Sequence, residues 1–295
     1  MNKDPAGVKW IRLQAVSGGY MEVLADEMPN KPSGKYTACE TSNPTCIKMI
    51  RGIKGIIFDF DGTLFDNKLF GFRLVTANLL DTIHIRNERV VRNNFSGRDF
   101  LSAENYYRAF FTGLGKICLR PPEKMRSWYF DKYMPRMVRV LKKYYKARPG
   151  LNELLKRMDS PDSPIQTAIY SDYPFLKERM EAVDLPYTER IRLYSPESYG
   201  AQKPAVRPFL QIAKDMQLTP EEILVIGDRE DTDGLGAFNA GMRFFCLETG
   251  NKRYHSLDPN RRKLEKEPQG PTLLMYAGAW DGLCKLIKNR VGLTV

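Results

Sequence analysis

The chain has 295 residues, of which 42% are hydrophobic and 27% are charged, so a buried core is feasible and wholesale disorder is excluded. No stretch approaches the roughly 18 uninterrupted apolar residues that a membrane-spanning helix needs. The formal net charge is +11 but unevenly spread: residues 66–149 hold 18 Lys and Arg against 7 Asp and Glu, whereas residues 150–248 hold 11 against 17. A basic segment therefore adjoins an acidic one.

The cysteines and histidines exclude a zinc site of the thiolate–imidazole kind. The five cysteines are scattered without a C-x-x-C pair, and there are only two histidines, His84 and His255. Residues 1–5 include an acid and no apolar run of the kind found in export signals. We therefore expect reduced thiols, a cytoplasmic location, and oxygen ligands for any bound metal.

In chain order, residues 1–50 form an N-terminal extension in which Val8–Val16 and Gly19–Leu24 have the character of strands. Apolar runs typical of buried parallel strands follow at Ile53–Phe58, Gln166–Tyr170, Ile223–Gly227 and Arg243–Leu247. Helical spacing is found at residues 151–158 and 209–216, and Thr219 to Glu222 has the features of a helix start. Strands that alternate with helices predict a doubly wound, Rossmann-like α/β core made of residues 51–66 and 150–249.

More than one hundred residues separate the first two core strands, too many for one crossover helix. Residues 67–149 therefore form a predicted helical insertion. One helix face in it is marked by Tyr129, Tyr133, Met137, Val140 and Tyr144, and Pro135 is expected to kink or split that helix. The last segment, residues 250–295, is expected to end in a helix over about 273–288 that packs on the core.

Carboxylates follow two of the predicted strands directly. Asp59 and Asp61 follow the first strand, and residues two apart in extended chain project to the same side. Asp228, Asp231 and Asp233 follow the strand at 223–227. Open α/β sheets bind ligands beyond the carboxyl ends of their strands, so both acidic groups are expected at one site. Carboxylates gathered in this way favour a hard cation such as Mg²⁺.

These residues also form a family pattern. Asp59-Phe60-Asp61-Gly62-Thr63-Leu64 resembles the first motif of the haloacid dehalogenase-like superfamily of phosphohydrolases. Ser171, at the end of a strand, resembles the second motif, and Lys203 in Gln202-Lys203-Pro204 resembles the third. Asp228 to Asp233 resembles the acidic fourth motif. The four motifs occur in the family's order, and a helical cap between the first and second motifs is a family feature that residues 67–149 match in position and size.

The resemblance implies a role for each motif residue. Asp59 is the expected nucleophile, which forms an aspartyl-phosphate, and Asp61 is the expected acid and base. Ser171 and Lys203 are expected to bind the phosphoryl group. Mg²⁺ is expected to be held by Asp59, Asp228, Asp233 and the backbone carbonyl of Asp61. One departure from the family is Asp172, which stands where Asn often follows the second-motif Ser.

Each of these residues also has a plain structural interpretation. Asp228 has the position of a helix N-cap, Ser171 that of a turn residue, and Lys203 that of a surface cation. Asp59 and Asp61 are harder to explain in this way, because two adjacent buried acids are unfavourable without a partner. An acid at position 61 favours phosphoryl transfer from oxygen, since family members with another residue there tend to perform dehalogenation or phosphonate cleavage.

The predicted function is Mg²⁺-dependent hydrolysis of a small anionic phosphate monoester, a phosphorylated metabolite. Arg73, Arg92, Arg98 and Arg108 of the basic insertion are candidate contacts to a second anionic group of the substrate, although a solvated helical face explains the same charge. One alternative is a phosphomutase with the same motifs. Another is nucleic-acid binding through the insertion, which is less expected because no binding module is recognisable and the acidic site would repel a phosphate backbone. Neither a membrane nor a nucleic acid is an expected partner, and the oligomeric state is not predicted.

Overall fold

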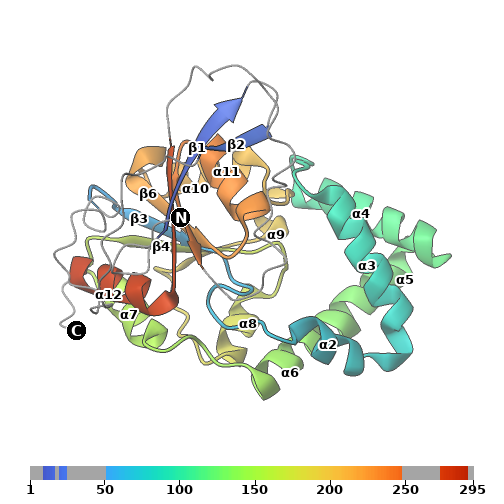
Figure 1. The fold of residues 1–295 in the computed structure, drawn as a ribbon. Helices are drawn as coiled ribbons and strands as arrows, with labels where there is room; N and C mark the ends of the chain where they lie inside the picture. Colours follow the sequence, from blue (N-terminus) through green and yellow to red (C-terminus); the bar gives the residue numbers. More distant parts are fainter. Residues whose placement is uncertain (1–8, 17–19, 25–50, 248–272, 292–295) are drawn as a thin grey trace, which may run out of the picture.

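A computed structural model describes residues 9–16, 20–24, 51–247 and 273–291 of the chain (Figure 1). Its sheet contains strands in the order β2-β1-β8-β7-β6-β3-β4-β5. The strands are β1 (Lys9–Val16), β2 (Tyr20–Leu24), β3 (Gly55–Phe58), β4 (Gln166–Tyr170), β5 (Arg192–Tyr194), β6 (Ile223–Gly227), β7 (Arg243–Leu247) and β8 (Leu273–Gly278). The run from β8 to β5 is parallel, whereas β1 is antiparallel to both of its neighbours.

Helices and short turns connect the strands and build the insertion. The cap elements are α2 (Phe70–Thr76), η1 (Leu79–Asp81), α3 (Thr82–Phe95), α4 (Ala103–Cys118), α5 (Pro122–Ser127), η2 (Trp128–Tyr133) and α6 (Met134–Tyr144). The elements of the core are α7 (Leu151–Met158), α8 (Leu176–Ala182), α9 (Pro196–Tyr199), α10 (Val206–Asp215), η3 (Pro220–Glu222), η4 (Glu230–Gly234), α11 (Leu235–Asn239) and α12 (Trp280–Arg290). The expected class, a parallel α/β sheet with an inserted helical cap, is confirmed.

Alternating strand residues divide the core into two layers. Ile56 and Phe58 of β3 pack in the cluster that contains the buried residues of α7, α8 and α12, together with the cap. Ile57 packs on the other face with residues of α10 and α11. Strands covered on both faces are apolar throughout, and this explains why three of the four predicted core strands have the expected bounds.

The chain passes between core and cap at a narrow junction. Phe65, on the way out, pairs with Ala147, on the way back, as an isolated antiparallel bridge. Arg148 strengthens this junction because its guanidinium donates hydrogen bonds to the carbonyls of Thr63 and Gly62, at 2.7 and 2.8 Å. The loop that carries the first motif is therefore hydrogen-bonded to the segment in which the chain returns from the insertion to the core.

The aromatic stripe predicted in the insertion is buried, except that Tyr144 remains 46% exposed. Pro135 lies in the first turn of α6, directly after the π-helical segment η2. A proline has no N–H for the bond to the preceding turn, and a widened turn accommodates its ring. The helix is therefore not split at Pro135: the backbone remains helical from η2 into α6, and the irregularity is the π-helical turn before the proline.

Two predictions from periodicity were wrong in part. Residues 273–278 form strand β8, and the last helix starts only at Trp280, because the apolar run Leu273-Leu274-Met275 is used to pair with β7 and β1. The expected helix at Thr219 is a single turn, η3, that leads directly into β6. The predicted strands at 8–16 and 19–24 correspond to β1 and β2, and the polar stretch at 250–270 lies outside the described residues.

The last helix, α12, packs on α7. Trp280, Leu283 and Ile287 are buried in the main hydrophobic cluster, and the Trp280 indole N–H donates to the Pro149 carbonyl at 2.8 Å. Among the described helices, none has both the length and the apolar character needed to span a bilayer.

Candidate active site

The carboxyl edge of the sheet brings the four sequence motifs together. Strand β3 lies between β6 and β4, so Asp59 after β3 has Asp228 after β6 on one side and Ser171 after β4 on the other. The Asp59 amide donates to the Ile226 carbonyl at 2.8 Å, which continues the ladder up to the site. Lys203 reaches the same point from the segment before α10.

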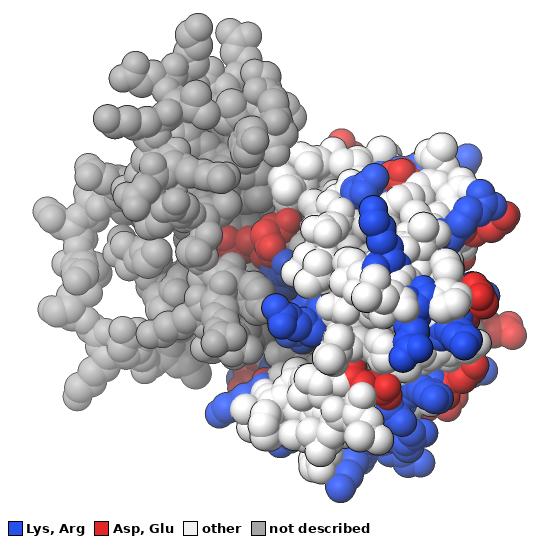
Figure 2. All heavy atoms as spheres, turned by 90° about the vertical axis from the view of Figure 1, so that its right-hand side faces the viewer, with Lys and Arg blue, Asp and Glu red and all other residues white. Residues whose placement is uncertain are grey.

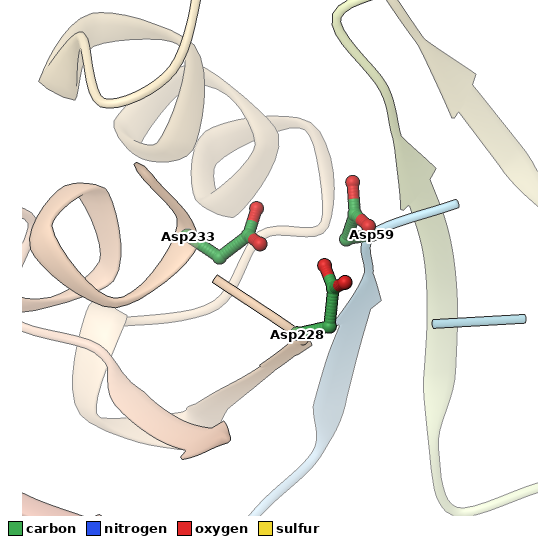
Figure 3. A group of neighbouring side chains, drawn as sticks. All are labelled: Asp59, Asp228 and Asp233. Carbon is green, nitrogen blue, oxygen red and sulfur yellow. The ribbon is translucent and has the colours of Figure 1, made fainter. Parts of the chain in front are cut away.

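Three carboxylates converge at the centre of this edge. Asp59, Asp228 and Asp233 offer oxygens that all lie within 4.8 Å of one another, and Figure 3 shows the three side chains directed toward a common point. The residues are 8%, 6% and 2% exposed. Hard oxygen donors in such a cluster match a divalent cation of the Mg²⁺ type, and the residues present fit the expected metal. The Asp61 side chain is not part of the cluster.

Two glycines make this convergence possible. A Cβ atom on Gly62, whose φ is +87°, would lie 2.3 Å from an Asp228 carboxylate oxygen. A Cβ atom on Gly227, the last residue of β6, would lie 2.4 Å from an Asp233 oxygen. Only glycine leaves room for the carboxylates at both places, so the backbone next to each acidic motif is shaped around the cluster.

Lys203 forms ion pairs with two carboxylates of the cluster. Its Nζ is 2.5 Å from Asp59 Oδ1 and 2.6 Å from Asp233 Oδ1, and it donates to the Tyr170 carbonyl at 3.3 Å. Burial alone would lower the pKa of Lys203, but the carboxylates of Asp233 and Asp59 raise it well above its ordinary value. The lysine is therefore charged, and the interpretation of Lys203 as a surface cation is excluded by its 4% exposure.

One ammonium does not balance three carboxylates. Burial, with Asp233 and Asp61 nearby, raises the pKa of Asp59 from 3.8 to about 7 despite the opposing effect of Lys203. Burial and the charges of Asp59 and Asp233 raise the pKa of Asp228 to about 8. Burial also raises the pKa of Asp233. The cluster thus has an excess of negative charge that protons or a divalent cation must offset.

Asp61 and Ser171 lie on the other side of Asp59. The carboxylate of Asp61 forms an ion pair with Arg179 of α8, and Ser171 Oγ is 3.4 Å from Asp61 Oδ2. Arg179 also donates to Ser171 Oγ at 3.0 Å. The acid and the serine that the resemblance selected are thus adjacent, and a buried arginine joins them.

Asp172, which departs from the family pattern, forms hydrogen bonds with Lys203 and Arg92. Its Oδ1 accepts a hydrogen bond from the backbone N–H of Lys203 at 3.0 Å, and its backbone carbonyl accepts one from Arg92 Nη1 at 2.6 Å. Burial raises the pKa of this carboxyl. Asp172 therefore holds the segment that carries Lys203 in register with the loop after β4.

The four cap arginines differ in surroundings. The Arg92 side chain is 10% exposed. It pairs with Glu88 through an Nε bond of 2.8 Å, donates to the Tyr129 hydroxyl at 2.9 Å and lies over the ring of Tyr173 at 3.9 Å. These contacts, with the one to Asp172, make it a strut between cap and core. Its commitment to internal partners favours a structural role over substrate contact.

The other three arginines are more open to solvent. Arg73 stacks on Tyr144 and Tyr145 beside a pocket at the junction of core and cap. Arg98 is exposed and lies against Phe95 and Phe100. Arg108 pairs with Glu104 on the exposed side of α4. The specificity assignment of all four remains a prediction, and Lys and Arg side chains are prominent on the face that the cap presents (Figure 2).

The cap also contacts the core through its backbone. The turn between α3 and α4 lies along the segment before Lys203, where Asp99 and Ala201 form an antiparallel bridge. The Gly97 N–H donates to the Lys203 carbonyl at 3.2 Å. The cap is therefore hydrogen-bonded to the residue whose ammonium lies in the carboxylate cluster.

Three residues of the site were missed by the sequence reasoning. Thr63 donates to Asp59 Oδ2 at 3.1 Å, and its place four residues after the first acid was a usable signal. Arg148 lies at the return of the insertion, where Pro149-Gly150 marked a boundary. Arg179 has no local signal, because only the turn from β4 into α8 brings it beneath Ser171.

The comparisons with known proteins agree with this arrangement. The family model of the haloacid dehalogenase-like hydrolases matches residues 53–241, well over half of the chain. The chain therefore belongs to the haloacid dehalogenase-like hydrolases. The match includes all four motifs and the whole of the helical insertion.

The solved structures that the chain resembles are distant in sequence. The L-2-haloacid dehalogenase of Xanthobacter autotrophicus is 19% identical with a TM-score of 0.49, and the alignment covers 80% of this chain and 98% of that one. A structure described as that of a predicted phosphoglycolate phosphatase from Haemophilus somnus 129PT is 17% identical with a TM-score of 0.46, covering 67% and 86%. No curated protein matches the chain.

Proposed function

We propose that this hydrolase is a Mg²⁺-dependent phosphatase that acts on a small phosphorylated metabolite. The observation that carries the proposal is the excess of buried carboxylate at Asp59, Asp228 and Asp233 beside a further acid at Asp61. Hydrolytic dehalogenation expels a halide, which needs no proton, from a carbon centre that bears no charge. Phosphate monoesters instead present an anionic centre and a basic leaving oxygen, so they need both a cation and an acid.

The metal has a defined place in this proposal. Asp59, Asp228 and Asp233 would hold it, with the backbone carbonyl of Asp61 as the ligand that the family resemblance adds. When bound, a divalent cation offsets the charge of the phosphoryl group and favours the ionised form of the carboxylates around it. Lys203 supplies a second positive charge next to the nucleophile.

The residues of the chain divide the reaction between them. Asp59, oriented by Lys203 on one oxygen and Thr63 on the other, attacks phosphorus while the bond to the leaving oxygen breaks. Asp61 gives its proton to that leaving oxygen. A water molecule then attacks the aspartyl-phosphate, Asp61 takes a proton from it, and Asp59 is released with inorganic phosphate. Ser171 donates a hydrogen bond to a phosphoryl oxygen in both steps.

The test is an assay of phosphate release from p-nitrophenyl phosphate with Mg²⁺, with EDTA, and for Asp59→Asn. We expect turnover that depends on Mg²⁺ and falls at least ~10³-fold in the variant, because the covalent route is removed. Chloride release from 2-chloropropionate serves as the comparison reaction. Chloride release without phosphate release would overturn the proposal, as would turnover that EDTA and Asp59→Asn leave unchanged.

A further inference from the structure

The contacts of Arg179 indicate more than a structural ion pair. Arg179 comes from α8 and its side chain is 0% exposed. One terminal nitrogen, Nη1, donates to Ser171 Oγ at 3.0 Å and to the Tyr173 carbonyl at 3.3 Å. The other, Nη2, pairs with Asp61 Oδ2. One guanidinium thus contacts both the expected acid, Asp61, and Ser171, the expected hydrogen-bond donor to the phosphoryl group.

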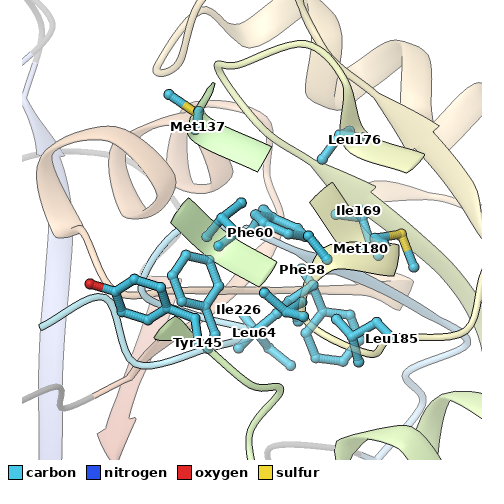
Figure 4. Packing of buried hydrophobic residues seen from close by; sticks show 14 of the residues in the cluster. Phe58, Phe60, Leu64, Met137, Tyr145, Ile169, Leu176, Met180, Leu185 and Ile226 are labelled. Atoms are coloured by element: carbon cyan, nitrogen blue, oxygen red, sulfur yellow. The ribbon is translucent and has the colours of Figure 1, made fainter. Parts of the chain in front are cut away.

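The guanidinium is also fixed in orientation. Its central carbon lies over the ring of Phe60, 4.4 Å from the ring centroid, and 5.6 Å from that of Tyr173. Phe60 itself is fully buried among core residues that include Met180 of α8 and Ile226 of β6 (Figure 4). An arginine held by stacking and by its planar donor fork presents its N–H groups in one direction.

The two oxygens of Asp61 have different surroundings as a result. Oδ2 faces Arg179 and lies 3.4 Å from Ser171 Oγ. Oδ1 is buried and has no hydrogen-bond partner among the described residues. A buried polar atom without a partner is unfavourable, so such an atom at a reactive site points to a partner that arrives with the substrate.

The hydroxyl of Ser171 is oriented by the same arginine. Ser171 Oγ accepts hydrogen bonds from Arg179 and from the Tyr173 backbone N–H at 3.1 Å. A hydroxyl has two acceptor positions and one proton, so both acceptor positions are used and only donation remains. The bond to Asp61 Oδ2 is long at 3.4 Å, which leaves this proton available to a phosphoryl oxygen.

We propose that Arg179 is a positioning residue, which holds Asp61 by Oδ2 so that the unpartnered Oδ1 faces the leaving-group oxygen, and which fixes Ser171 as a hydrogen-bond donor. This inference rests on the proposed phosphatase function. It predicts a specific kinetic defect when Arg179 is replaced. Esters whose leaving group is a strong base need the proton from Asp61, whereas esters with a weakly basic leaving group do not.

Two aryl esters separate these cases. The 4-nitrophenolate ion is a much weaker base than phenolate, while the phosphoryl groups of the two esters are identical. For Arg179→Gln we expect kcat/KM for phenyl phosphate to fall about 10–100-fold more than kcat/KM for 4-nitrophenyl phosphate, with most of the loss in kcat. Arg179→Lys keeps the charge and the stack but lacks the fork, and it should show the same split to a smaller degree.

Asp61→Asn is the matched comparison. If Arg179 acts through Asp61, the single variant Asp61→Asn shows the same split, and Arg179→Gln in the Asp61→Asn background adds nothing to it. The double variant also removes both partners of the buried pair, so it remains informative if Arg179→Gln alone does not fold. Melting temperatures of all variants report the structural part of each loss.

Three outcomes decide the matter. The positioning role is overturned if Arg179→Gln lowers kcat/KM equally for both esters. It is also overturned if Arg179→Gln, added to Asp61→Asn, still lowers kcat/KM for phenyl phosphate more than for 4-nitrophenyl phosphate by the full factor. Either result leaves the phosphatase proposal intact. Failure of the unaltered protein to hydrolyse either ester with Mg²⁺ overturns the proposed function and this inference with it. The expected split, lost in the Asp61→Asn background, supports both.

Discussion

On the β6 side of Asp59, three carboxylates lie together and two of them, Asp59 and Asp233, form ion pairs with Lys203. On the β4 side, the one carboxylate of Asp61 faces the buried Arg179. The first side has an excess of negative charge, and the raised pKa values of Asp59 and Asp228 result from it together with burial. The second side is balanced within the chain. The difference indicates which side waits for a cation and which is organised before any ligand arrives.

The strongest way to break the carboxylate-rich side is to remove its own cation. Lys203→Met leaves Asp59 and Asp233 without their shared partner, so we expect kcat with Mg²⁺ to fall about 10³-fold, in line with the loss of one charged stabiliser of the transition state. Lys214→Met, which alters an exposed lysine on neighbouring α10, is the control and should retain activity. Activity of Lys203→Met within threefold of the unaltered protein would contradict the role of Lys203.

The pH dependence of stability without metal tests the same imbalance. Because the folded-state pKa values of Asp59 and Asp228 are raised from 3.8 to about 7 and about 8, the folded protein keeps protons that the unfolded chain releases. This contribution is complete below about pH 4 and is lost as the pH rises through about 8.

We therefore expect the unfolding free energy in EDTA to fall by a few kcal/mol from pH 5 to pH 8, on the order given by the linkage relation, and the melting temperature to decline with it. Mg²⁺ competes with those protons, so its stabilising effect should grow over the same pH range. Thermal melts at four pH values, with EDTA and with Mg²⁺, measure both. A stabilising effect of Mg²⁺ that shrinks toward pH 8 would contradict the assignment of the cluster as the metal site.

Asp228→Asn sharpens the comparison by separating stability from activity. The amide removes one of the mutually repelling groups, so we expect the metal-free protein at pH 8 to gain about 1–2 kcal/mol of unfolding free energy. Activity should fall, and the Mg²⁺ concentration needed for half-maximal turnover should rise. Asp231→Asn, at an exposed acid of the same turn, is the matched control for urea unfolding and metal titration. A destabilised metal-free Asp228→Asn protein would speak against electrostatic repulsion in the cluster.

Ser171→Ala is the mildest change, and it belongs to the balanced side. The loss of one hydrogen bond to the phosphoryl group should lower kcat/KM about 10-fold. Since 4-nitrophenyl and phenyl phosphate share that group, the loss should be equal for both, in contrast to the split expected for Arg179→Gln. Parallel kinetics on the two esters provide the measurement, and an unequal loss would assign the hydroxyl to the leaving group instead.

The core and the four motifs were predictable because their signals are local. Strands covered on both faces are continuous apolar runs, and the acids follow them directly, so β6 and Asp228 could be located without knowledge of the fold. The resemblance supplied the order of the motifs. Local pattern therefore predicted the four central strands and the acids that follow β3 and β6, whereas β5 was not predicted and β8 was expected to be helical.

What the sequence did not reveal depends on contacts between distant segments. Arg179 is an ordinary charged residue of a helical segment until the fold of α8 places it under Asp61, 118 positions away in the chain. The segment at 273–278 is apolar enough for either a helix or a strand, and its pairing with β1 and β7 decides for a strand. Nothing in the sequence near Arg92 distinguished a residue that links cap and core from a surface cation.

The position of β1 has a consequence for the way the protein is made. Among the described strands, β8 (residues 273–278) is the one that joins β1 (residues 9–16) to the parallel part of the sheet. A ribosome delivers the second partner more than 250 residues after the first. The strands from β3 to β7 and their carboxyl edge can assemble while the nascent chain is still growing, but the hairpin of β1 and β2 must wait until β8 has emerged.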